Sequence, residues 1–258
     1  MQTSKLQRLL WTAVVATTLA ACATPQQMEQ QAGREFEKLR ETAPLVKDRA
    51  TIDYVACVAN AIVDVLEPPD SEMYWELAIV DNPTINAFVM PGGKIVVFSG
   101  LLDVAQNQHQ LAAVLGHEVA HVTEDHPEER MRNQEIASFG VETAARVLGG
   151  GYARETYAAY GGLSTITQLG LLNPFSRGQE TEADLVGLEY MAKAGFDPRE
   201  SVELWKQMNE KNEARVPEYL STHPSGETRI DDLIGRYPKA LVFFNQAKAE
   251  GKAPNCEP

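Results

Sequence analysis

The chain has 258 residues, of which 44% are hydrophobic and 23% charged, and its formal net charge at pH 7 is -13. The apolar content suffices for a hydrophobic core, so we expect a folded protein. The strong negative charge argues against binding to nucleic acid, and no nucleic-acid role is predicted.

Residues 1–21 have the pattern of a bacterial signal peptide. A short basic region precedes an apolar run over 9–19, which is too short to span a membrane. The Leu-Ala-Ala-Cys sequence that follows resembles the lipobox, which implies cleavage before Cys22 and lipidation of its thiol. The residue after it, Ala23, is not the aspartate associated with inner-membrane retention, so the periplasmic face of the outer membrane is favoured. The alternative is ordinary secretion, with Cys22 lost or free.

The next residues, 22–44, are predicted to be a tether between the lipid and the folded domain, because 23–33 is rich in glutamine and contains a proline. We expect the domain itself to span 45–258. A helical pattern over 35–66 is ended by two consecutive prolines.

Cys57 and Cys256 lie near the two ends of the expected domain. An even pair of cysteines in an oxidising compartment predicts a disulfide, which would tie the C-terminal tail to the body. In the chain-entropy model, closing so long a loop stabilises the fold by about 5 kcal/mol. The alternative is two free thiols, since the sequence does not give their separation.

Three short strands are predicted at 75–80, 86–90 and 95–98, and a Pro-Gly-Gly turn joins the last two into a hairpin. If Asn86, Ala87 and Phe88 form an exposed edge near a catalytic site, a peptide substrate can pair with their backbone without strong sequence preference. The alternative is a purely structural hairpin.

The sequence Gly-His-Glu-Val-Ala-His at 116–121 carries the strongest chemical signal. His117 and His121 are four residues apart and therefore lie on one face of a helix, where both rings reach one ion. Glu118 is offset sideways, so its carboxylate can contact a water at the metal without becoming a ligand. This H-E-x-x-H pattern is the zinc metalloprotease signature. The alternative is a helix with two incidental histidines, but an apolar run with Asn107 as N-cap places the motif in a buried helix.

Two further histidines are not predicted to bind the metal. His126 is five residues after His121, and on a continuing helix that spacing turns it away from the ligand face. His109 is interpreted as a surface or packing residue in the same way. An amphipathic helix is expected at 128–148, and residues 152–175, with two adjacent glycines, are a candidate flap over the site.

The segment 176–184 begins a helix with Ser176 as cap and Gln179 at the capping-box position. A catalytic zinc needs a third protein ligand. Glu180 and Glu182 point about 200° apart on a helix, so only one of them can face the ion. Asp184 shares a face with Glu180. We therefore predict Glu180 as the ligand and Asp184 as the carboxylate that fixes the tautomer of a ligand histidine, with Glu182 left to solvent or a structural contact.

Taken together, these motifs resemble the zinc endopeptidases of the CAAX-prenyl-protease and HtpX type, over about residues 45–240. With a lipobox and no membrane helices, the chain is most similar to the periplasmic lipoprotein branch, the LoiP/BepA-like outer-membrane metalloproteases, and the placement of the two cysteines looks similar as well. The resemblance implies zinc ligation by His117, His121 and Glu180, with Glu118 as catalytic base. It also places at the active site His223, from a Thr-His-Pro segment, and Arg229. The matching motifs are Asn86-Ala87-Phe88, Pro91-Gly92-Gly93, Gly100-Leu101-Leu102, the H-E-x-x-H helix, Glu180-x-x-Ala183-Asp184 and Thr222-His223-Pro224 with Arg229.

The expected fold is α+β: a mostly helical zincin-type metallopeptidase domain, with a small antiparallel sheet packed on the H-E-x-x-H helix. The expected activity is zinc-dependent hydrolysis of peptide bonds in unfolded or misassembled envelope proteins, with one Zn²⁺ per chain and attachment to the membrane through Cys22. A lipoprotein chaperone or assembly factor that binds clients in the same cleft with little proteolysis is the main alternative; intact Glu118 argues against a dead enzyme and leaves a mainly binding role open. A zinc amidase acting on cell-wall peptides is disfavoured by the hairpin and Thr-His-Pro matches.

Two roles remain open for His223. Its imidazole can stabilise the oxyanion, together with Arg229, or it can occupy the fourth position on zinc in a closed resting state. Latency is useful to a protease tethered among unfolded exported chains, so a gating role is favoured.

Overall fold

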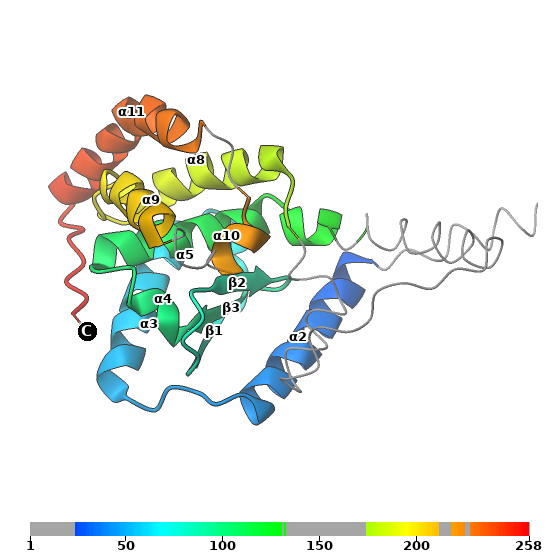
Figure 1. Cartoon of the computed structure of the whole chain (residues 1–258). Coiled ribbons are helices and arrows are strands. Elements are labelled where there is room, and N and C mark those ends of the chain that lie inside the picture. The colour runs from blue at the N-terminus through cyan, green and yellow to red at the C-terminus, as the bar shows by residue number, and fades with distance from the viewer. Residues whose placement is uncertain (1–23, 131, 133–173, 212–217, 225–227, 258) are drawn as a thin grey trace, which may run out of the picture.

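A computed structural model of the chain describes residues 24–130, 132, 174–211, 218–224 and 228–257. The expected signal peptide, Cys22 and nearly all of the expected amphipathic helix and flap lie outside these residues. The described part is mostly helical with one small sheet, as predicted, and none of its helices is both long and apolar enough to cross a membrane. Its helices are α2 (Pro25–Thr42), α3 (Arg49–Val63), the 3-10 helix η1 (Asp70–Glu72), α4 (Ser99–Leu102), α5 (Gln108–Thr123), α8 (Arg177–Lys193), α9 (Glu200–Lys211), α10 (Glu218–Thr222) and α11 (Arg229–Ala249) (Figure 1).

The sheet is mixed rather than antiparallel. Its strands β1 (Glu76–Val80), β2 (Ala87–Met90) and β3 (Lys94–Phe98) lie in the order β1-β3-β2. β2 and β3 form the predicted antiparallel hairpin, whose turn uses Gly92 and Gly93 at φ 77° and 73°. The third strand, β3, lies between the other two and runs parallel to β1. The two edges differ, since β1 is bridged by Leu45 while β2 is the outer strand of the hairpin.

Helix α2 replaces most of the expected tether. Its buried residues Met28, Ala32, Phe36 and Leu39 recur at helical spacing and pack on one face of the sheet, against side chains such as Phe88 and Phe98. Thr24 caps the helix through a capping box with Gln27. The helical pattern predicted over 35–66 is two helices, α2 and α3, because Pro44 disfavours helical conformation in the residue before it.

The opposite face of the sheet packs on the main core, where α5 is central. Alternate strand residues such as Ile79, Val89 and Val97 join this core with Leu111 and Leu115 of α5. The sheet is thus buried on both sides, between α2 and the group of helices around α5 (Figure 1). This fixes α5 between the sheet and α8.

Helices α5 and α8 touch through their backbones at Gly116 and Gly187. A Cβ atom on Gly116 would lie 2.7 Å from the carbonyl oxygen of Gly187, and a Cβ atom on Gly187 would lie 2.6 Å from the amide nitrogen of His117. No side chain fits in either place. The two helices can approach this closely only because both positions are glycine.

The C-terminal tail returns to the body after α11. A disulfide joins Cys256 to Cys57 of α3, with 5.7 Å between their Cα atoms, and the amide of Cys256 donates a hydrogen bond to Gln108 at the start of α5. The tail therefore connects α3 to the end of the helix that carries the H-E-x-x-H motif.

We expect reduction to lower the melting temperature of the wild-type protein, because the 199-residue separation between the cysteines makes the loop they close a long one. The matched control is the Cys57→Ala, Cys256→Ala double variant, whose melting temperature should not respond to reductant. Thermal unfolding followed by circular dichroism measures both, and equally large shifts in the two proteins would contradict a stabilising bond.

Candidate active site

Helix α5 presents the H-E-x-x-H motif from a buried position. Asn107 caps the helix by accepting hydrogen bonds from the amides of His109 and Gln110. His117, Glu118 and His121 are each at most 2% exposed. Buried polar side chains need partners, so the motif must be satisfied by other elements.

Helix α8 supplies the carboxylates. Ser176 and Gln179 form the predicted capping box, which fixes the first turn and with it Glu180. Glu180 and Asp184 are buried and face α5, whereas the side chain of Glu182 is 55% exposed. The structure thus places Glu180, and not Glu182, beside the two histidines.

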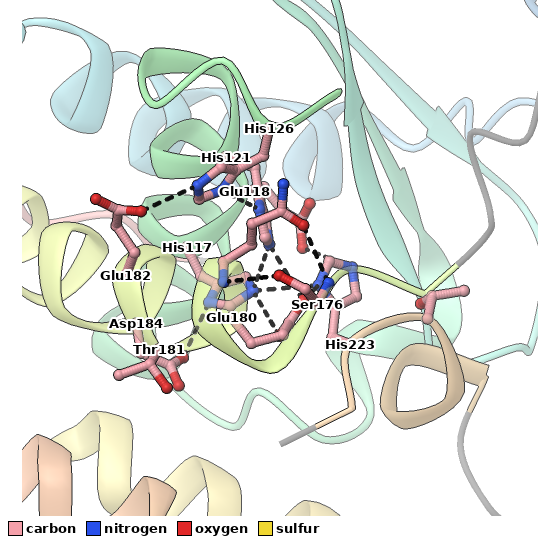
Figure 2. A network of polar contacts seen from close by, with 12 residues as sticks. His117, Glu118, His121, His126, Ser176, Glu180, Thr181, Glu182, Asp184 and His223 are labelled. Atoms are coloured by element: carbon pink, nitrogen blue, oxygen red, sulfur yellow. Dashed lines mark hydrogen bonds and ion pairs between the residues drawn. The ribbon is translucent and has the colours of Figure 1, made fainter. Parts of the chain in front are cut away.

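Four ligand atoms converge between α5, α8 and the segment after α10 (Figure 2). They belong to His117, His121, Glu180 and His223 and all lie within 4.8 Å of one another. Nε2 of His117 is 3.0 Å from Nε2 of His121 and 3.1 Å from Nδ1 of His223. The carboxylate of Glu180 lies 3.1 Å from His223 and 3.5 Å from each of the other histidines.

This arrangement fits a zinc ion. Ligand atoms about 2.1 Å from a tetrahedral zinc are about 3.4 Å from one another, close to the spacings found here. Three ring nitrogens facing each other at such short range cannot all carry protons, and a shared cation removes the conflict. Histidine nitrogen and carboxylate oxygen are also the ligand types that zinc prefers.

The electrostatics favour a cation at the same point. Burial alone would raise the pKa of Glu180, but the neighbouring His223, His117 and His121 hold that pKa far below its usual range. Burial works against charge on His117, yet the hydrogen bonds of Asp184 and Glu180 raise its pKa to about 9. Burial lowers the pKa of His121. The site therefore holds an ionised carboxylate next to a position that attracts a proton or a metal.

Asp184 and Arg229 orient the ligands from behind. Oδ1 of Asp184 lies 2.9 Å from Nδ1 of His117, as predicted for a residue that fixes the tautomer. Arg229 donates from Nε to Asp184 at 2.5 Å and from a terminal nitrogen to Glu180 at 2.8 Å, and its guanidinium lies 3.8 Å over the ring of Trp205. These contacts make Arg229 a positioning residue for both carboxylates, and its role as an oxyanion donor stays a prediction.

Glu118 lies next to the ligand group and faces His223. Oε1 of Glu118 is 3.4 Å from Nε2 of His223, and it has no hydrogen-bond partner in the described part of the chain. Tyr219 stacks on His223 with 4.4 Å between ring centroids and an angle of 20°. Its role was missed by sequence reasoning, although it precedes His223 by one helical turn.

The edge strand begins close to this segment. The amide of Tyr219 donates to the carbonyl of Ile85 at 3.1 Å, so α10 is tied to the residue before Asn86. Both polar side-chain atoms of Asn86 are buried without a hydrogen-bond partner in the described residues. Asn86, Ala87 and Phe88 are at most 4% exposed, so this edge is buried in the structure and is not the exposed edge that the substrate-strand prediction required.

The histidines that were not expected to bind metal do not join the ligand group. His109 accepts a hydrogen bond from the amide of Asp197 and packs on Phe196. His126 is buried, with its ring against that of His121.

We expect Glu180→Gln to lower zinc affinity strongly and Glu182→Gln to change it little, because only Glu180 lies among the ligand atoms and a glutamine at position 182 still offers an oxygen that accepts hydrogen bonds. Competition with a colorimetric zinc chelator measures both affinities. The two changes remove the same charge at positions two residues apart on α8, so each is the control for the other. Loss of metal by Glu182→Gln instead would reject this ligand assignment.

Sequence comparisons agree with this geometry. The pattern that describes peptidase family M48 matches residues 49–237. Over 220 residues the chain is 37% identical to the mitochondrial metalloendopeptidase OMA1 of Schizosaccharomyces pombe, covering 84% of this chain and 62% of that protein. It is 30% identical over 215 residues to the beta-barrel assembly-enhancing protease of Escherichia coli O157:H7, covering 81% of this chain and 43% of that protein. The chain thus spans about two fifths to three fifths of the length of these relatives. The match to the family covers most of the chain and includes every predicted zinc ligand, and the chain belongs to peptidase family M48.

Proposed function

We propose that the protein is a zinc-dependent endopeptidase. The observation that carries this proposal is the convergence of His117, His121 and Glu180 on one point, next to Glu118, whose Oε1 has no hydrogen-bond partner among the described residues. A carboxylate that can act as a base beside three protein ligands is typical of catalytic zinc sites, and Glu118 is the feature that distinguishes this group from a structural site with four ligands. Membership of peptidase family M48 supports the same activity.

The residues divide the chemistry between them. Zinc, when bound, supplies a Lewis acid that makes a water easier to deprotonate and a carbonyl easier to attack. Glu118 accepts the proton from the attacking water and then delivers it to the leaving amine. Asp184 and Arg229 hold His117 and Glu180 in place throughout. The β2 edge is the candidate to bind the substrate backbone as an added strand, which requires that the buried residues Asn86, Ala87 and Phe88 first become accessible.

We infer that the substrates are unfolded or misassembled proteins of the bacterial envelope. Backbone pairing at a strand edge needs an extended segment and reads little of its sequence, which suits unfolded chains. One relative is named for enhancing β-barrel assembly, which is consistent with an envelope location. The lipobox-like sequence before Cys22 supports a lipid anchor on the periplasmic face of the outer membrane, and the cysteine pair suits that oxidising compartment.

We further propose that His223 gates the site. Its Nδ1 lies among the ligand atoms, 3.1 Å from both His117 and Glu180, and so takes the fourth position that a catalytic zinc keeps open. Its other nitrogen faces Glu118. In this resting arrangement His223 excludes water from the metal and from the base, and substrate binding must displace it.

We expect Glu118→Gln to keep zinc and fold but lose nearly all hydrolysis, because an amide cannot accept the proton of the attacking water. Casein digestion and zinc content of the purified mature protein measure the two properties. The variant is nearly isosteric, so substantial remaining peptidase activity would refute the role of Glu118 as base.

We expect His223→Ala to raise basal casein digestion, because the fourth position becomes accessible to water. Zinc content should remain near one per chain, held by the other three ligands. An oxyanion donor would behave oppositely, since its loss lowers turnover by roughly a hundredfold or more. Turnover at or below the wild-type value, with zinc unchanged, would therefore count against gating.

A further inference from the structure

His126 contacts His121 directly, although it was predicted to point away from the ligands. Their Nδ1 atoms lie 2.9 Å apart, and His126 is 2% exposed. The prediction assumed a continuing helix, but α5 ends at Thr123 and Asp125 adopts a φ of 56°, in the left-handed region. The chain turns back there and brings His126 against the outer side of His121 (Figure 2).

The short distance fixes where the protons lie. If Nε2 of His121 faces the metal, its remaining proton is on Nδ1 and must be donated outward. At 2.9 Å the facing Nδ1 of His126 must then accept, because two N–H groups cannot point at each other. His126 is therefore held as the tautomer with its proton on Nε2.

Glu182 accepts the hydrogen bond that the Nε2–H group of His126 donates. Its Oε2 lies 3.4 Å from Nε2 of His126, on the side facing away from His121. A carboxylate only accepts hydrogen bonds, so it favours the Nε2–H tautomer of His126 and, through it, the Nδ1–H tautomer of His121. Asp184 performs the same task for His117 in one step.

We propose that His126 and Glu182 are positioning residues for the zinc ligand His121. Their hydrogen bonds form a relay that starts at the protein surface and fixes the tautomer of His121 at the metal. The relay rests on the proposed zinc function. Glu182, with a side chain 55% exposed, thereby gains a role that its position outside the ligand group does not reveal.

The inner bond is tested by zinc affinity of the loaded full-length protein, measured by chelator competition. His126→Ala removes the acceptor and should weaken zinc binding by about 10- to 100-fold, the usual effect of losing a residue that orients a ligand. His126→Asn places a carbonyl oxygen near the former Nδ1 and should restore affinity to within about threefold of wild type. Equal loss in both variants would show a packing role and overturn the relay.

The outer bond is tested by two charge reversals. Glu182→Lys puts a donor against Nε2 of His126, which favours a proton on Nδ1 facing the donor of His121, and should weaken zinc binding by about tenfold. Glu129→Lys is the matched control: Glu129 also acts on His126 through its charge, but its carboxylate bonds to Gln179. Equal effects of the two reversals would show that Glu182 acts only through its charge, and would overturn its role as the hydrogen-bond acceptor of His126. No effect of Glu182→Lys would do the same.

These measurements separate the relay from the proposed activity. A wild-type protein that binds zinc but digests no casein would reject the endopeptidase, while the variants would still decide the relay. A wild-type protein that binds no zinc would overturn both.

Discussion

The metal site depends on the close contact of α5 and α8. His117 and His121 belong to one helix and Glu180 and Asp184 to the other, and their backbones meet at Gly116 and Gly187, next to these side chains. A methyl group at either glycine would push the helices apart by a sizeable part of an ångström. Zinc ligands tolerate only a few tenths of an ångström in distance, so the glycines set the separation on which ligation depends.

The close contact of α5 and α8 also buries the carboxylates of Glu180 and Asp184. This burial explains why other charged side chains surround the zinc ligands. Carboxylates removed from water are unfavourable unless they are paired and hydrogen-bonded. Arg229 of α11 meets this need for two of them at once, by bonding both Asp184 and Glu180. Its position on Trp205 of α9 connects the ligand group to two further helices. The fold around α8 is thus organised by the same carboxylates that face the metal.

The sequence predicted those parts of the site that local periodicity controls. The i to i+4 spacing of His117 and His121, and of Glu180 and Asp184, decides which side chains share a helix face before any tertiary contact forms. The Pro-Gly-Gly turn likewise fixes one strand pair. The order of the three strands was not predictable in this way, because it depends on where β3 enters the sheet. Arg229 shows a related limit, because a motif places a residue near a site without showing which contacts it makes there.

Helix α2 and His126 show two other limits of such reasoning. In α2 the apolar spacing was present, but a glutamine-rich composition outweighed it, and the sheet face that makes the helix necessary is not visible in the sequence. For His126 the prediction assumed helical spacing beyond Thr123, where α5 ends. Asp is among the residues that tolerate left-handed backbone, so the Asp125-His126-Pro127 sequence carried a signal for a turn.

Helix α10 and the following His223 explain how substrate binding and gating of the metal can be coupled in the proposed enzyme. Tyr219 bonds the carbonyl of Ile85 through its amide, stacks on His223 through its ring, and accepts from the amide of His223 through its carbonyl. The gate and the start of the substrate edge are therefore joined by one residue. A peptide that pairs along β2 approaches the strand where this residue is attached, so any shift of Tyr219 must also move His223 relative to Glu118 and the ligands. Occupation of the edge and opening of the fourth position then become two aspects of the same displacement, and a protease built in this way exposes its metal only where an extended chain is already present.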